Sequence, residues 1–132
     1  MSQENVEIVR EQFEATNRGE FSRPMADWAD EVELVAEEGT NAGTYSGRDV
    51  VGDWFGDWFR MFRGGVHFDL RKIRDSGDAV AVAADHRARG SRSGIELTQT
   101  FFYEYRIRDG RIVRIRFHSS WQEALEALGL SE

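Results

Sequence analysis

The clearest pattern in the chain is an alternation of apolar and polar residues from Gly94 to His118. An alternation with a period of two is typical of a β-strand that has one buried face and one solvated face. The alternation is interrupted once, by Asp109-Gly110. Asp-Gly favours a tight hairpin turn because both residues tolerate a positive φ. The pattern therefore predicts two long antiparallel strands joined by a tight turn.

The face of these strands that we expect to be buried is apolar except at two positions. On the first strand its members are Ile95, Leu97, Gln99, Phe101, Tyr103, Tyr105 and Ile107. Gln99 and Tyr103 would point inward, and inward polar groups usually mark a cavity rather than a solid core. The opposite face is mainly charged or Thr, with Phe102 as its apolar exception. The sequence thus predicts a pocket on the concave side of the sheet.

Helices are expected before most of the strands. Ser2 suits the cap of a helix over about 3–18, Pro24 suits the first turn of a short second helix, and a third helix is expected over about 48–63. A loop rich in Gly, Thr, Asn and Ser is expected from Glu38 to Gly47. Further strands are expected at about 32–37, 66–74 and 78–89, with a short tail helix at 122–130. This order predicts one α+β domain over residues 1–132, with helices covering one face of a curved, mostly antiparallel sheet.

Composition narrows the classes of function. The chain has 132 residues, 40% hydrophobic and 31% charged, which is typical of a folded domain. A formal charge of −7 argues against nucleic-acid binding, and the absence of Cys excludes a disulfide framework and a thiol nucleophile. We expect no membrane span, no signal peptide and a cytoplasmic location. The three His do not combine with acids at a recognised metal spacing, so neither a metal nor a cofactor is expected.

Short motifs follow one another along essentially the whole chain. They are Glu4 through Phe13 with Asn17 to Glu20, Trp28 to Leu34 (WADEVEL), Tyr45 to Val51 (YSGRDVV), Trp58, Asp109 to Val113 (DGRIV) and Glu123 to Leu125. In this order they resemble SnoaL-like domains of the nuclear transport factor 2-like superfamily. The resemblance implies a cone, in which a bent sheet wraps around three helices and leaves a pocket at its open end. Because the superfamily includes isomerases, cyclases, dehydratases, epoxide hydrolases and non-catalytic binding modules, the resemblance leaves the function open.

The catalytic residues of ketosteroid isomerases do not carry over to this chain. The resemblance places Phe13, Ala36 and Tyr103 at the positions of the helix tyrosine, the basic aspartate and the protonated aspartate. The base is therefore missing and the helix donor has lost its hydroxyl. The late-strand acid of SnoaL-type cyclases is also missing, since the inward positions there are Ile115, Phe117 and Ser119.

A different polar set remains on the inward face. If the strand over 78–89 buries its apolar residues, His86 also turns inward, beside the strand that carries Gln99 and Tyr103. Imidazole titrates near neutral pH and a phenol can donate to a developing oxyanion, so His86 and Tyr103 are a candidate acid–base pair. Gln99 is a second hydrogen-bond donor, and Glu38 could orient or replace the imidazole at the mouth.

Two other interpretations of His86 stay open. It can be a core or pocket-lining histidine that only bonds to Tyr103 or Gln99. A register slip of one residue would instead turn it to solvent and bring Asp85 and Arg87 inward.

The expected lining of the pocket is aromatic. Trp54 and Trp58 lie one helical turn apart and form either a wall for a flat apolar ligand or simply part of the core. The other expected lining residues are Phe13, Phe101, Ile115 and Phe117. This lining predicts a small, largely apolar organic ligand.

The outer face of the sheet suggests a homodimer. Rows of acids and arginines there are either solvated ion pairs or complementary surfaces of two sheets, and the resemblance favours the dimer. Phe102 would lie at its centre, and His67 and His118 would be surface or interface residues. Two hypotheses of function remain: a cofactor-independent lyase-, isomerase- or cyclase-type enzyme, and a non-catalytic ligand-binding or dimeric interaction module.

Overall fold

The computed structural model describes residues 2–36, 42–62, 65–89 and 96–131. In chain order the elements are α1 (Ser2–Asn17), a 3₁₀ helix η1 (Arg23–Asp27), β1 (Trp28–Ala36), β2 (Gly43–Ser46), α2 (Arg48–Arg60), β3 (Val66–Asp75), β4 (Ala79–Arg89), β5 (Glu96–Arg108), β6 (Arg111–His118) and α3 (Trp121–Ala127). The strands form one sheet in the order β2-β1-β6-β5-β4-β3. Only β1 and β6 pair in parallel among the described strands. The expected α+β class with a mostly antiparallel sheet is confirmed.

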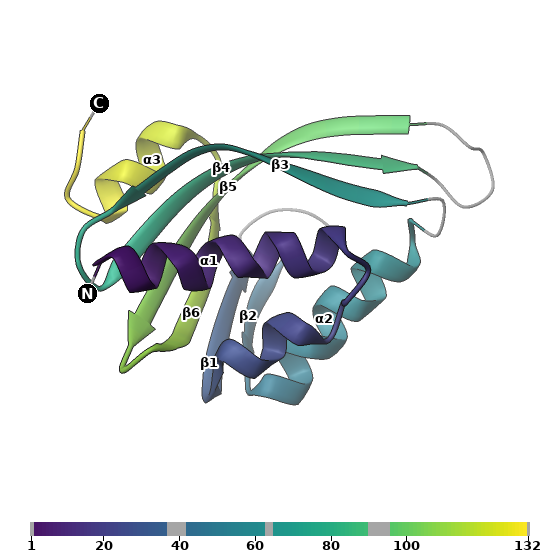
Figure 1. Ribbon diagram of the computed structural model, residues 1–132, viewed down its shortest axis with the longest axis horizontal. Coiled ribbons are helices and arrows are strands. Elements are labelled where there is room, and N and C mark those ends of the chain that lie inside the picture. The colour runs from purple at the N-terminus through teal and green to yellow at the C-terminus, as the bar shows by residue number, and fades with distance from the viewer. Residues whose placement is uncertain (1, 37–41, 63–64, 90–95, 132) are drawn as a thin grey trace.

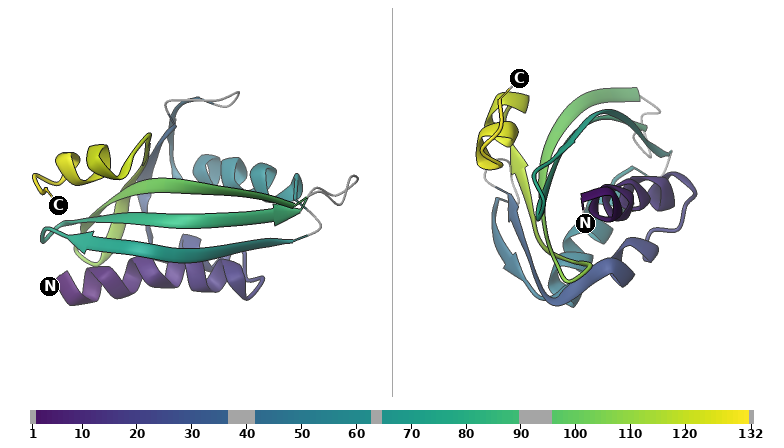
Figure 2. Two further views of the ribbon diagram at one scale, coloured as in Figure 1. Left: turned by 90° about the horizontal axis from the view of Figure 1, so that it is seen from above. Right: turned by 60° about the vertical axis from the view of Figure 1, so that its left-hand side comes forward.

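The sheet is strongly curved, and α1 lies in its hollow (Figure 1). Register shifts between Trp28 and Glu33, between Leu70 and Lys72, and between Arg106 and Ile107 mark irregularities of the kind that bend strands. Figure 2 shows α1, η1 and α2 on the concave side and α3 on the convex side. None of the helices in the described ranges has the length and apolar character needed to span a lipid bilayer.

The concave face of the sheet carries the main core. On β4 the inward residues Val80, Val82 and Ala84 are fully buried, and His86 retains 4% exposure. His86 therefore points inward, as the alternation predicts. The turn between β5 and β6 is also confirmed, with a positive φ at both Asp109 and Gly110.

The convex face differs from the expectation, because α3 covers part of it. Ala79 and Ala81 of β4 are fully buried against Ala124 and Leu125 of α3. Phe102, which we expected at the centre of a dimer interface, packs against this same cluster. A dimer through the convex face stays a prediction.

We expected His118 to be a surface or interface residue, but its side chain is 8% exposed and belongs to a buried polar cluster beneath α3. Its Nε2 lies 2.8 Å from Oε1 of Glu104, which is 3% exposed. Arg106 donates from Nε to Glu104 Oε2 at 2.5 Å and from Nη2 to the Ala127 carbonyl at 2.6 Å. Burial alone would raise the pKa of Glu104, but the bonds from His118 and Arg106 hold it below its ordinary value. The cluster thus fastens α3 to the sheet through a paired carboxylate.

One strand was missed in the sequence. β2 lies within the expected loop and pairs with the end of β1, from Glu33–Ser46 to Ala36–Gly43. It is four residues long at the edge of the sheet, and three of those residues are exposed. Such a short, polar edge strand has no apolar alternation to reveal it.

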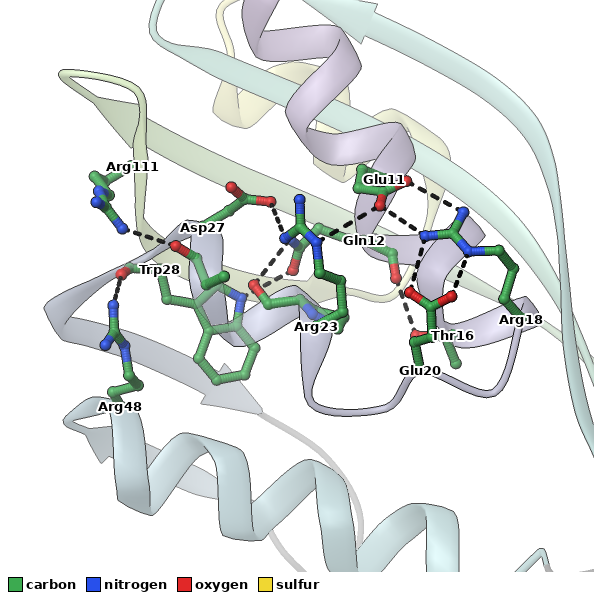
Figure 3. A network of polar contacts seen from close by, with 12 residues as sticks. Glu11, Gln12, Thr16, Arg18, Glu20, Arg23, Asp27, Trp28, Arg48 and Arg111 are labelled. Atoms are coloured by element: carbon green, nitrogen blue, oxygen red, sulfur yellow. Dashed lines mark hydrogen bonds and ion pairs between the residues drawn. The ribbon is translucent and has the colours of Figure 1, made fainter.

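Amide side chains of α1 anchor the helix across the sheet. Asn17 bonds in both directions with the backbone of Phe68 on the edge strand β3, with Nδ2 to the carbonyl and Oδ1 from the N–H, each at 2.8 Å. Gln12 accepts from Trp28 Nε1 at 2.8 Å and donates to the Pro24 carbonyl (Figure 3). These bonds satisfy backbone and side-chain groups that would otherwise be unpaired.

We predict that Asn17→Ala lowers the free energy of unfolding by about 1–3 kcal/mol, because it leaves two backbone groups of Phe68 without a partner. The matched control is Asn5→Ala, which removes one exposed bond to the Gly77 carbonyl and should cost less than about 1 kcal/mol. Alanine is the better helix former at both positions, so helix propensity affects both variants alike. Urea unfolding measures both, and equal losses would contradict the anchoring role of Asn17.

Candidate ligand-binding site

Described residues on the concave side line a pair of cavities, and the larger has a volume of about 730 Å³. It lies between α2, the first half of β5 and the end of β6. β5 continues beyond its last pair with β6, Phe102–His118, so none of the described strands pairs with that edge of residues 96–101. This difference in strand length leaves the cone open at one end.

The walls of the larger cavity are aromatic and its mouth is polar. Five aromatic or apolar residues of α2 and the turn after it face the sheet residues Phe101, Tyr103 and Phe117. Those five are Trp54, Phe55, Trp58, Phe59 and Met61. Ala36 ends β1 at the cavity, and the polar residues of the lining are Gln99, Thr100, His118, Ser119 and Glu123. This arrangement suits an apolar body with a polar group at one end.

The smaller cavity, of about 220 Å³, lies between α1, η1, α2 and the middle of the sheet. It shares a wall of aromatic rings with the larger cavity, made by Phe55, Phe59, Phe68 and Tyr103. Gly52 lets Met25 of η1 pack against α2, since a Cβ at that position would lie 2.8 Å from the Met25 Cε. Gly52 and Met25 both border the cavity.

Tyr103 lies where the two cavities meet. Its ring packs edge-on against Phe13, with centroids 5.2 Å apart, and at a tilt of 49° against Phe117, with centroids 4.9 Å apart. Burial raises the pKa of Tyr103 well above its ordinary value, so the phenol stays protonated. Its hydroxyl has no hydrogen-bond partner among the described residues. The phenol is therefore a free donor on the concave side.

His86 lies behind the aromatic wall. Its ring centroid is 4.4 Å from Trp58, 4.9 Å from Phe68 and 5.6 Å from Phe101, and it lines neither cavity. Its Nε2 is buried without a hydrogen-bond partner in the described part of the chain. Burial lowers the pKa of His86 to about 4, so the imidazole is neutral near pH 7.

The structure does not bring His86 and Tyr103 together as a pair. His86 is opposite Gln99 in the sheet register, whereas Tyr103 is opposite Val82. The ring of Phe101 lies between them, at 5.6 Å from His86 and 6.4 Å from Tyr103. A direct proton transfer between the two side chains is not available in this arrangement.

The remaining expected site residues divide between the cavities. Trp54, Trp58, Phe101 and Phe117 line the larger one, whereas Phe13 and Ile115 line the smaller one. Both tryptophans also pack against the core, so wall and core are the same residues. Gln99 is exposed at the mouth, and Glu38 lies outside the described residues.

Sequence reasoning missed several lining residues. Phe59 was detectable, because it follows Phe55 by one helical turn on α2. His118, Ser119 and Glu123 could not be detected, because no local pattern shows that β6 ends opposite Phe102 and leaves the first residues of β5 unpaired on that side. Within the described ranges, no group of three His, Asp or Glu side chains could hold a metal ion.

Comparisons with known proteins agree on one fold. Residues 9–115 match the model of the SnoaL-like domain. An NTF2-like protein of unknown function from Burkholderia pseudomallei superposes with a TM-score of 0.79 at 23% identity, over 97% of this chain and 98% of that one. A putative SnoaL-like polyketide cyclase from Jannaschia sp. gives 0.78 at 14% identity, over 99% and 95% of the two chains.

A third structure, from Mycobacterium tuberculosis, was solved in complex with estradiol-17β-hemisuccinate. It gives a TM-score of 0.76 at 15% identity, over 91% of this chain and 95% of that one. No curated protein matches the sequence. At these identities the likeness to solved structures establishes the fold alone.

The low pKa of His86 predicts a pH-dependent stability. Between its ordinary pKa of 6.5 and about 4, the unfolded chain takes up a proton that the folded chain does not. The free energy of unfolding should therefore fall as the pH is lowered from about 6.5 to about 4, by on the order of 3 kcal/mol. His86→Phe keeps an aromatic ring in the cluster and should abolish this part of the pH dependence. Urea unfolding at a series of pH values measures it.

The matched control is His67→Phe, which replaces an exposed histidine of β3 beside Asp69. This variant should keep the slope of the native protein between pH 6.5 and 4. A His86→Phe protein with an unchanged slope would show that the imidazole is not the group responsible.

Proposed function

The chain belongs to the SnoaL-like domain family, and on that premise we propose that it binds a small, largely apolar organic molecule in the larger cavity. The observation that carries the proposal is the cavity itself, about 730 Å³ with aromatic walls and a polar mouth. Small-molecule sites are typically concave, mostly apolar and about 300–1,000 Å³ in volume. The size and the chemistry of the lining both fit that description.

The form of the walls favours a flat ring system. Trp54 on α2 and Phe117 on β6 contribute rings to the lining from opposite elements, with centroids 5.8 Å apart. Trp58 and Phe101 make a second contact between α2 and the sheet, edge to face with centroids 6.1 Å apart. A planar apolar ligand in the cavity would gain burial and ring stacking against these side chains. The steroid ester in the Mycobacterium tuberculosis structure is consistent with a ligand of this shape.

A second candidate function is a cofactor-independent lyase-, isomerase- or cyclase-type enzyme. It is favoured by His86, a neutral imidazole whose Nε2 has no partner among the described residues. Tyr103 would supply the hydrogen-bond donor. In this candidate Trp58 has to move, because it lies between the imidazole and the cavity.

Nuclear magnetic resonance of the His86 imidazole nitrogens separates the two candidates. If His86 acts on the ligand, addition of estradiol-17β-hemisuccinate should shift the Nε2 resonance strongly. If the protein only binds, the indole resonances of Trp54 and Trp58 should shift while Nε2 changes little. A shift at Nε2 without any change at Trp58 would contradict both candidates.

Filling the larger cavity should abolish binding. Ala36 is 5% exposed and ends β1 at the cavity, so Ala36→Leu places three additional carbon atoms in the hollow. We expect at least a tenfold loss of affinity for 1-anilinonaphthalene-8-sulfonate, a fluorescent probe of apolar sites, because the ligand and the new side chain compete for the same space. The fluorescence titration gives the dissociation constant directly.

The control is Ala29→Leu on the same strand, at a half-buried position that lines neither cavity. It should bind the probe as the native protein does. Equal binding by native protein and Ala36→Leu, or no binding by the native protein, would refute the proposed site.

A further inference from the structure

We propose that the smaller cavity is a second binding chamber for an apolar group that carries a hydrogen-bond acceptor, such as a ketone or ether oxygen. In this proposal the hydroxyls of Tyr103 and Tyr105 donate to that oxygen. The proposal goes beyond the function proposed above, which concerns the larger cavity. Tyr105 lines only the smaller cavity, whereas Tyr103 borders both.

The first observation is that both phenols are buried without a partner. Tyr103 and Tyr105 each retain 4% exposure. Neither hydroxyl bonds to any residue that the structure describes. Neither oxygen is among the fully buried polar atoms without a partner, so each keeps some exposed area, and both residues line the smaller cavity. A buried hydroxyl without a partner costs about 1–3 kcal/mol, so two of them at one cavity call for an acceptor.

The other buried polar side chains of this cavity are already engaged. The side-chain oxygen Oε1 of Gln12 accepts from Trp28 Nε1, and its Nε2 donates to the Pro24 carbonyl. The Thr16 hydroxyl donates to the backbone carbonyl of Gln12 at 2.9 Å. Among the described lining residues, the two phenols are therefore the buried polar side chains that make no hydrogen bond.

The two tyrosine rings lie side by side. Tyr103 and Tyr105 occupy successive inward positions of β5, and their rings are nearly parallel, 26° apart with centroids at 5.9 Å. Both pack edge-on against Phe13, at 5.2 and 6.2 Å. Burial raises the pKa of each phenol, so both remain protonated donors. One oxygen with two lone pairs can accept from both.

The volume limits the size of the group. An apolar cavity of about 150 Å³ holds benzene, so about 220 Å³ fits a skeleton of one or two small rings. The rest of the wall is apolar, with Phe13, Met25 and Ile115 among its members. The chemistry that fits is thus a small carbocycle with one acceptor oxygen.

A pair of matched probes tests this proposal: 1-indanone, a bicyclic ketone, and indane, the same skeleton without the oxygen. Affinities are measured by nuclear magnetic resonance titration for the native protein, Tyr105→Phe and Tyr103→Phe. Each variant should bind 1-indanone about threefold to tenfold more weakly, the value of one hydrogen bond, and indane within twofold of the native protein. Tyr45→Phe, a tyrosine of β2 that lines neither cavity, should leave both affinities unchanged.

Urea unfolding supplies a second readout of opposite sign. Because Tyr105→Phe removes an unpaired hydroxyl, the variant should be as stable as the native protein or more stable while it binds the ketone less well. An equal effect on both probes, no binding of 1-indanone, or a less stable variant with unchanged ketone affinity would overturn the proposal. Failure of the anilinonaphthalene titration would count only against the larger cavity, so the two proposals fail separately.

Discussion

The hydrogen bonds between the amide side chains of α1 and the backbone around it are the constraint on which the concave side depends. Asn17 pairs with both backbone groups of Phe68, as a neighbouring strand would. Gln12 joins the indole of Trp28 to the Pro24 carbonyl. Because these bonds are directional, they hold α1 at a set distance from the sheet, whereas apolar contact alone would let the helix settle deeper. The smaller cavity, which α1 lines through Gln12, Phe13 and Thr16, depends on this position of the helix.

The length of the strands then decides where the hollow opens. β5 runs from Glu96 to Arg108, but β6 ends at His118, which is opposite Phe102. Gln99, Thr100 and Phe101, on the part of β5 beyond this last pair, border the larger cavity. Rigid rings suit this role, since they keep their positions with few rotatable bonds and leave space that flexible side chains would fill.

Local patterns in the sequence were sufficient to predict which residues are buried on the concave face of the sheet but not on the convex face. Alternation along β4 and β5 correctly predicted that His86 and Tyr103 point inward, and Asp109-Gly110 correctly predicted the turn. The same alternation led to the expectation of a solvated convex face, which is wrong at His118 because a helix three residues later in the chain folds back over it. The prediction that His86 and Tyr103 lie close together failed for another reason. A period-two pattern specifies the face on which a residue lies but not which residues are opposite each other. Register is set by the bulges and turns of the whole sheet.

Three consecutive residues of β5 show how the two faces differ in purpose. Glu104 points to the convex side, and both of its oxygens accept hydrogen bonds, one from His118 and one from Arg106. Tyr103 and Tyr105 point to the concave side, and neither hydroxyl has a partner among the described residues. The fold therefore satisfies a buried carboxylate where the packing is structural and leaves two donors unsatisfied where the sheet borders cavities. Since an unpaired buried group lowers stability, a site that keeps two of them is suited to a guest that supplies the missing acceptor.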